Sequence, residues 1–234
     1  MQPVATPRRN NLLCALPALD YGRLLPSLEA VDLPPAMVLF EPGAPIEFAY
    51  FPTESVVTLS YAIEKRVMAK AWSVGREGMV GISLFLETPN RDSRAQVEAG
   101  GLAFRLPAAA LMTELRRAGA LRRVLLRYLA ALLTQCSQLC VCHRHHTLEQ
   151  RYCNFLLRVF AEQSSKSTLI TQRRIGLLLG VRRESITEIA CRLQQAGIID
   201  YRRGRITLLE RKSLQNRACT CDGIIRRALA CVAP

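Results

Sequence analysis

Cysteine and histidine side chains gather in one short stretch, CSQLCVCHRHH, at residues 136–146. On a helix, Cys136, Cys140 and His143 fall at positions i, i+4 and i+7, which lie on one face. Thiolates and an imidazole on one face could hold zinc or an iron–sulfur centre, or act as a thiol-based redox sensor. The stretch lacks a Cys-x-x-Cys pair, and cysteine is also a common small core residue. A metal or iron–sulfur centre is therefore an alternative here, and the sequence requires no cofactor.

The other cysteines and the apolar segments bear on the compartment in which the chain works. Cys219 and Cys221 stand two positions apart on a helix expected over residues 213–230, where side chains diverge, so a structural role is expected for both. The first residues, MQPVATPRRNN, contain no apolar segment of the kind that directs secretion. The most apolar stretch, residues 124–133, is short and contains Arg127, so no membrane span is expected. We therefore expect free thiols in a reducing cytoplasm.

A second group of residues could recognise nucleic acid, and the segment 171–209 contains the helices that would position it. Thr171 is a good N-cap for a first helix, and Gly180 supplies the left-handed turn that ends this helix. A second helix with one apolar stripe is expected from about Arg182 to Gly197.

A basic hairpin is expected directly after the second helix. Two short strands are predicted over residues 198–201 and 206–209, and Gly204 permits a tight turn between them. Helix, turn, helix and basic hairpin together predict a winged helix-turn-helix.

The physical case for DNA is geometric, because the N-terminal residues of a helix in the major groove can reach base edges. Arg183 can place two donors on the acceptors of a guanine, and Glu184 can accept from the amine of a cytosine. Phosphate contacts, which fix position rather than sequence, are expected from the other polar residues of the motif: Thr171, Arg182, Ser185, Arg202, Arg203 and Arg205. The expected partner is double-stranded DNA.

The charge of the chain agrees with a polyanionic partner. Its 32 Lys and Arg residues exceed its 19 Asp and Glu residues, which gives a net charge of +13. Residues 147–234 contain 16 of the basic and 7 of the acidic residues, so most of the excess accompanies the motif. A merely solvated basic face, or non-specific binding of any nucleic acid, is the alternative interpretation.

The first half of the chain has a different pattern of apolar residues. Residues 1–10 are expected to be disordered, and short helices are expected over residues 11–16 and 20–28. Short apolar segments punctuated by Pro and Gly follow, and they predict strands over residues 56–61, 67–72, 95–99 and 103–106. Many short strands with no long helix between them predict an antiparallel barrel or jelly roll.

One long helix is expected from Ala120 to about His146, between the barrel and the helix-turn-helix. Alternating spacings of four and three, as along the seam of a two-stranded coiled coil, relate Leu121, Leu125, Tyr128, Leu132, Gln135 and Leu139. A helix packed on its own barrel needs a similar stripe, so that interpretation stays open. We favour a homodimer, because helix-turn-helix proteins commonly read the two half-sites of a pseudo-palindromic operator as dimers.

The expected fold class is α+β, in three parts. A jelly-roll sensor domain is predicted over residues 1–118, a dimerisation helix over 119–146 and a winged helix-turn-helix domain over 147–234. In this order the elements resemble the Crp–Fnr superfamily of bacterial transcription regulators, from about Leu12 to Leu209. The most specific match is the superfamily's Gly-x-x-Arg-Glu-Ser/Thr-Val/Ile pattern, which appears here as Gly180-Val181-Arg182-Arg183-Glu184-Ser185-Ile186.

The resemblance implies that Arg183 and Glu184 read bases. Some members carry a second arginine one helical turn later, where this chain has Glu188, so a different operator sequence is expected. An activator of this kind would also contact RNA polymerase.

In this superfamily the jelly roll can bind a cyclic nucleotide through a glycine-rich turn, a glutamate for the ribose and an Arg-Ser pair for the phosphate. The matching residues are Gly78, Met79, Gly81, Ser93 and Arg94, with Ser137 on the long helix as a further hydroxyl. Met79 replaces the glutamate, and a thioether cannot pair with a ribose hydroxyl as a carboxylate does. Iron–sulfur members use a cysteine cluster near the N-terminus, where this chain has only Cys14. Neither effector is expected, and the input to the barrel is left open.

Enzyme chemistry has no support in the sequence. The three histidines crowd between residues 143 and 146, and neither a Gly-x-Ser-x-Gly motif nor a phosphate-cradling loop is present. We expect a homodimeric transcription regulator that is not an enzyme. The alternative is a metal- or thiol-based redox sensor at residues 136–146 with DNA binding as its output.

Overall fold

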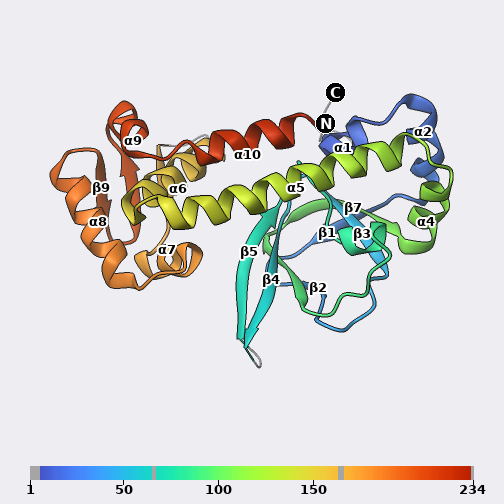
Figure 1. Ribbon diagram of the computed structural model, residues 1–234, viewed down its shortest axis with the longest axis horizontal. Coiled ribbons are helices and arrows are strands. Elements are labelled where there is room, and N and C mark those ends of the chain that lie inside the picture. The colour runs from blue at the N-terminus through green and yellow to red at the C-terminus, as the bar shows by residue number, and fades with distance from the viewer. Residues whose placement is uncertain (1–5, 65–66, 163–165, 233–234) are drawn as a thin grey trace. The chain divides into compact units, whose positions relative to one another are not determined.

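The structure is a computed structural model that describes residues 6–64, 67–162 and 166–232 (Figure 1). The chain forms two compact units. Unit 1 comprises residues 1–132 together with 228–234, and unit 2 comprises residues 133–227. The three-part division by role that the sequence suggests stays a prediction.

Unit 1 contains two antiparallel sheets. The first has the order β1 (Glu29–Leu33), β7 (Gly101–Pro107), β3 (Phe48–Pro52), and the second has the order β2 (Val38–Phe40), β6 (Ser93–Ala99), β4 (Val56–Glu64), β5 (Val67–Val74). Apolar side chains from both sheets, among them Leu33, Val57 and Ala95, form one buried cluster. The predicted antiparallel β architecture is confirmed.

Short helices and the first part of a long helix add a second core to unit 1. They are η1 (Pro7–Arg9), α1 (Asn11–Cys14), α2 (Ala18–Leu24), η2 (Leu25–Ser27), α3 (Ile82–Phe85), α4 (Ala108–Arg116) and α5 (Ala120–His145). Leu12 and Leu13 of α1 and Leu111 of α4 pack with Phe51 of β3 in this core, and all four are fully buried.

The expected disorder of residues 1–10 is corrected for residues 6–10, whereas residues 1–5 lie outside the described part of the chain. Asn10 is fully buried. Its Oδ1 accepts from Leu12 N at 3.0 Å, and its Nδ2 donates to Pro52 O at 3.0 Å and to Gly78 O at 2.9 Å. A buried amide with these partners fixes the backbone, because leaving it unpaired would be costly.

Four of the six residues of the predicted dimerisation seam are buried within the protomer, and the seam as a whole stays a prediction. Leu121, Leu125, Tyr128 and Leu132 are at most 8% exposed and pack in the core of unit 1, while Gln135 and Leu139 are half-buried. Side chains that fill the core of one protomer cannot at the same time contact a second. For this stripe the structure supports the other interpretation, a helix packed on its own barrel.

By length and composition alone, α5 is apolar enough to cross a membrane. Many of its apolar residues are explained by packing instead, because one face of the helix lies in the core of unit 1. The exposed face carries a second series of mainly apolar residues, interrupted by one serine and spaced by four, three, four and four residues: Leu126, Ala130, Leu133, Ser137 and Val141.

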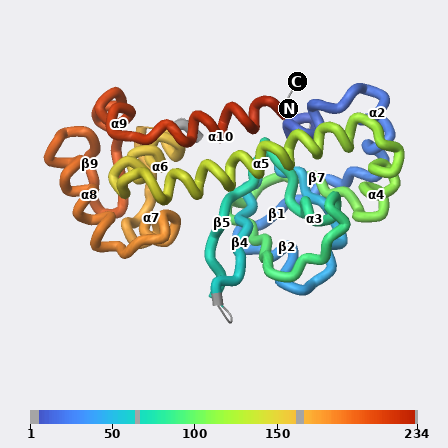
Figure 2. The backbone as a smooth tube through the Cα atoms, in the orientation of Figure 1, coloured from blue at the N-terminus to red at the C-terminus, as the bar shows by residue number. Residues whose placement is uncertain are grey.

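Unit 2 contains the predicted winged helix-turn-helix, whose backbone path is clear in Figure 2. Its elements are the end of α5, α6 (Leu148–Glu162), β8 (Ser167–Leu169), α7 (Gln172–Leu179), α8 (Arg183–Gln195), β9 (Ile199–Arg202), β10 (Arg205–Leu208), α9 (Arg211–Arg217) and the start of α10 (Cys221–Ala230). Side chains of α6, α7, α8 and the strands form its core, with Tyr152, Leu156, Ile175 and Ile186 fully buried.

Two features of unit 2 differ from the expectation. The small sheet has three strands in the order β8-β10-β9, so β8 extends the predicted hairpin. The single helix expected over residues 213–230 is broken at Ala218–Thr220, where Ala218 is extended with φ −82° and ψ 152°. The break contains Cys219 and directly precedes Cys221.

Candidate nucleic-acid interface

The turn between α7 and α8 is built from local signals in the sequence. Thr171 Oγ1 accepts from Arg174 N at 3.2 Å and thereby caps α7, and Gly180 ends the helix with φ +67°. Gly176 allows the following turn to fold back closely, since a Cβ at this position would lie 2.8 Å from Val181 O. The sequence signal for Thr171 and Gly180 was clear, but the need for glycine at 176 becomes apparent only from the contact.

Helix α8 separates its buried and exposed faces. Ile186, Ile189, Ala190 and Leu193 are at most 3% exposed and pack in the core of unit 2. Arg182, Arg183 and Glu184 at the N-terminal end are exposed, and Ser185 is half-buried. The side chains for which base contacts were predicted therefore point away from the core, as a groove-binding helix requires.

A side-chain contact fixes α8 against α7. Thr187 Oγ1 donates to Gln172 Oε1 at 2.6 Å, and it lies 3.0 Å from Arg183 O in the preceding turn. Sequence reasoning missed Gln172, because no local pattern relates it to a residue 15 positions away. The contact matters for recognition, since a base-reading helix must be held in register by its supporting helix.

The wing is a two-residue hairpin with Arg203 and Gly204 at its tip. Both have positive φ, +48° and +79°, while Arg202 pairs with Arg205 across the strands, which is the pattern of a type I′ turn. Arg202, Arg203 and Arg205 are all exposed. Arg202 Nε lies 3.2 Å from Asp200 Oδ1, and Arg205 Nη1 lies 3.4 Å from Ser167 Oγ.

The structure brings Thr171 to the base of this wing. Ile170 N donates to Gly204 O at 2.9 Å, and a Cβ on Gly204 would lie 3.8 Å from Thr171 Cγ2. Thr171 and the three wing arginines therefore share one edge of unit 2. That edge and the N-terminal end of α8 carry all eight residues for which DNA contacts were predicted.

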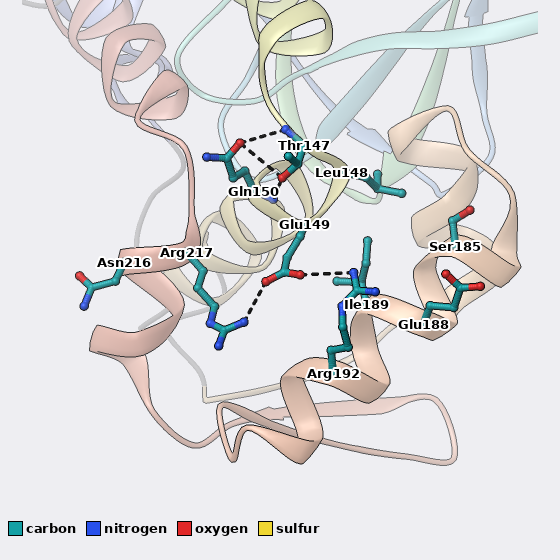
Figure 3. A pocket seen from close by; sticks show the side chains of 10 residues that line it. All are labelled: Thr147, Leu148, Glu149, Gln150, Ser185, Glu188, Ile189, Arg192, Asn216 and Arg217. Carbon is teal, nitrogen blue, oxygen red and sulfur yellow. Dashed lines mark hydrogen bonds and ion pairs between the residues drawn. The ribbon is translucent and has the colours of Figure 1, made fainter.

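A cleft of about 610 Å³ between α6, α8 and α9 adds residues that the sequence did not indicate. Glu149 lies at its centre (Figure 3), with Oε2 3.3 Å from Arg192 Nη2 and Oε1 2.9 Å from Arg217 Nη1. These ion pairs connect α6 to the recognition helix and to α9. No sequence signal relates Glu149 to arginines 43 and 68 residues further along the chain.

The residues matched to a cyclic-nucleotide site do not fit such a ligand. Met79 is 2% exposed and packs in the core of unit 1. Gly78 lies against Tyr128, whose hydroxyl donates to Met79 O at 3.5 Å, and burial raises the pKa of that tyrosine. A turn that is packed on Tyr128 presents no carboxylate to a ribose.

The other residues matched to an effector are engaged elsewhere or lie apart. Gly81 adopts φ +94° and begins the short helix α3. Ser93 Oγ lies 2.5 Å from Asn90 Oδ1, and Arg94 Nη2 forms an ion pair with Glu41 Oε1 at 2.8 Å. Ser137 is exposed on the part of α5 that belongs to unit 2. Within unit 1 the matched residues thus serve turns and ion pairs of the barrel.

The residues that the sequence offered as alternative metal ligands do not converge on one site. Cys136 and Cys140 are exposed. His143 Nδ1 lies 2.8 Å from Arg151 Nη1, and burial together with the Arg151 charge lowers the pKa of this imidazole. Among the described residues, the group whose ligand atoms converge is instead Cys142, His146, Cys219 and Cys221.

The comparisons with known proteins support the same assignment of fold. Residues 150–217 match the family described as the Crp-like helix-turn-helix domain. No curated protein matches the chain.

Several solved structures share the whole fold. A putative transcriptional regulator of the Crp/Fnr family from Eubacterium rectale aligns with a TM-score of 0.71 at 16% identity, over 90% of this chain and 98% of that chain. FixK2 from Bradyrhizobium japonicum aligns with a TM-score of 0.67 at 16% identity, over 82% and 98%. A Crp/Fnr family regulator from Thermus thermophilus aligns with a TM-score of 0.60 at 22% identity, over 81% and 98%.

An exposed basic recognition helix, a basic wing and a supporting β domain define the class of a DNA-binding transcription regulator. Residues 150–217 therefore form a Crp-like helix-turn-helix domain, and the chain shares the fold of solved Crp/Fnr-family regulators.

Proposed function

We propose that the protein binds a pseudo-palindromic DNA operator as a homodimer, with Arg183 and Glu184 of each protomer reading base edges. The observation that carries the proposal is the exposure of these two side chains at the start of α8, opposite a fully buried apolar stripe. Phosphate contacts come from the surrounding hydroxyls and guanidiniums: Thr171, Arg182, Ser185, Arg202, Arg203 and Arg205. Two recognition helices would then read half-sites about 34 Å apart.

The exposed face of α5 supplies the surface for the second copy. Leu126, Leu133 and Val141 are 49%, 63% and 47% exposed and continue one stripe along the helix. Leucines exposed to water along several turns of a helix cost free energy in a monomer. Their spacings of three and four residues suit pairing with an identical helix. An input to the barrel would act by changing how the two α5 helices pack, which shifts the population of DNA-binding dimers. RNA polymerase is a further partner if the protein activates.

Selection of duplexes from a random library with the full-length protein tests this function. We expect one palindromic consensus. Arg183→Ala should lose about 1–3 kcal/mol on that consensus and relax the preference at one base pair of each half-site. Arg203→Ala is the matched control, because a phosphate contact at the wing weakens binding to all sequences alike. Equal losses for Arg183→Ala on consensus and random duplexes would remove Arg183 from base reading.

A further inference from the structure

Four side chains with soft or borderline metal-ligand atoms meet within unit 2. The Sγ atoms of Cys142, Cys219 and Cys221 and a ring nitrogen of His146 all lie within 4.8 Å of one another. The three cysteines are 5%, 8% and 2% exposed, and His146 is half-buried. None of these residues takes part in the proposed DNA contacts.

Two distances within this group match the edges of a coordination tetrahedron. Cys142 Sγ and Cys219 Sγ are 3.7 Å apart, and Cys221 Sγ and His146 Nδ1 are 3.4 Å apart. Bonds of about 2.3 Å to sulfur and about 2.0 Å to nitrogen give tetrahedral edges of about 3.8 Å between two sulfurs and about 3.5 Å between sulfur and nitrogen. A disulfide would need a sulfur–sulfur distance of about 2.05 Å and would leave the imidazole and the third thiol without a role.

The backbone explains why the ligands converge. Cys142 lies in the last turn of α5, and His146 directly follows the helix and donates its backbone N–H to Cys142 O at 3.1 Å, so the two side chains stand one helical turn apart on one face. The break between α9 and α10 places Cys219 in an extended connection, where its N–H lies 3.4 Å from Gln150 O, and Cys221 at the first position of α10. On the continuous helix expected from the sequence, the side chains of Cys219 and Cys221 would diverge.

Two carboxamide groups donate to the sulfurs from outside the ligand set. Gln138 Nε2 lies 3.1 Å from Cys221 Sγ, and Asn154 Nδ2 lies 3.4 Å from Cys219 Sγ. Donors of this kind orient ligands and stabilise the anionic thiolate that a metal requires. A buried trio of thiols that served only as apolar filling would not call for amide donors.

We propose that Cys142, His146, Cys219 and Cys221 bind one Zn²⁺ ion. Three thiolates and one imidazole in tetrahedral arrangement are typical of zinc, and four protein ligands leave no open position, which is the pattern of a structural site. The spacing suits a single ion, because a cluster of several irons with bridging sulfides would hold its ligands further apart. The ion joins the end of α5 to the α9–α10 connection.

Metal analysis of the full-length protein, purified in reducing buffer, tests the site. We expect about one zinc per chain in the wild type and a loss to background in Cys142→Ser and Cys221→Ser. Cys140→Ser is the matched control, since this exposed cysteine on the same helix lies outside the group and should keep the zinc. Equal zinc contents in Cys142→Ser and the wild type would overturn the proposal.

Cobalt substitution of the wild type keeps the test decisive if the serine variants fail to fold. After removal of zinc with a chelator, Co²⁺ should restore the thermal midpoint and give the visible d–d bands and thiolate charge-transfer band of a tetrahedral thiolate site. Absence of these bands, iron with acid-labile sulfide in the native protein, or a Cys142–Cys219 disulfide in non-reducing peptide mapping would each overturn the proposal. If the wild-type protein contains zinc but does not bind DNA, the result contradicts the proposed function and leaves the zinc site supported.

Discussion

Three donors converge on one carboxylate oxygen of the barrel, Glu98 Oε2. Lys70 Nζ and Thr58 Oγ1 each lie 2.6 Å away, and Ser73 Oγ lies 3.0 Å away. Burial alone would raise the pKa of Glu98, but these hydrogen bonds and the Lys70 charge lower it to about 2. The ionised carboxylate is therefore part of the folded sheet β2-β6-β4-β5 rather than a surface charge.

Glu98→Gln should destabilise unit 1 at neutral pH and much less in acid. Because the folded pKa is depressed from 4.5 to about 2, the carboxylate stabilises the fold above pH 4.5 and loses this contribution as the pH falls towards 2. We expect the variant to lose on the order of 2–3 kcal/mol at pH 7. Urea unfolding followed by the fluorescence of Trp72, the single tryptophan, measures this at pH 7, 5 and 3.

Glu29→Gln is the control for this prediction. Glu29 pairs with Arg105 on the surface and its side chain is 52% exposed, so its removal should change stability by less than about 1 kcal/mol at any of these pH values. A Glu98→Gln deficit that is the same at pH 3 as at pH 7 would contradict the assigned pKa.

Among the helices, α5 presents two apolar stripes with different surroundings. One stripe fills the core of unit 1, and the other is exposed. Leu126→Glu together with Leu133→Glu should therefore abolish the dimer while leaving the protomer folded, since two like charges facing their copies across a seam repel in an apolar contact. Sedimentation velocity and circular dichroism measure the two effects separately.

Arg127→Glu provides a matched control on the same helix. It adds a negative charge at an exposed position outside the stripe, so the dimer should persist. Dimers of the double variant with wild-type sedimentation would remove this face of α5 from the proposed interface.

The two stripes of α5 also show what the sequence could predict and what it could not. Spacings of three and four identified a helix of the right length, but a stripe at Leu125 and a stripe at Leu126 satisfy the same periodicity. Which one is internal depends on the barrel, and no local pattern encodes that contact. The two helices and the turn of the helix-turn-helix were predictable for the opposite reason: the Thr171 cap, the Gly180 turn and the stripe of α8 are all local signals.

The candidate sites could be predicted only in part, because their residues come from distant parts of the chain. Cys142 and Cys219 are 77 residues apart, and Glu149 and Arg217 are 68 residues apart. Residue types alone indicated metal chemistry in the segment 136–146, yet the ligands that converge there come partly from the α9–α10 connection. A break in a helix that had been read as continuous was enough to hide them.

At the scale of the whole molecule, charge and symmetry combine in the salt dependence of DNA binding. The net charge of +13 favours any polyanion, so affinity at one salt concentration cannot distinguish a specific dimer from a basic monomer. The slope of log K against log salt concentration can distinguish the two, because it counts the phosphates that the protein neutralises. In a two-fold dimer every phosphate contact of the wing occurs twice.

Arg203→Ala should therefore reduce the slope by about 1.8 on a palindromic operator, twice the value of about 0.9 that one lost phosphate contact gives. On a duplex with a single half-site, the same substitution should change the slope by about 0.9. Arg203 suits this measurement because it sits at the tip of the hairpin and is exposed, so its removal leaves the fold of unit 2 intact. Fluorescence anisotropy between low and moderate salt supplies both slopes. Equal changes on both duplexes would mean that only one wing engages the DNA, and the two-fold arrangement of recognition helices would have to be abandoned.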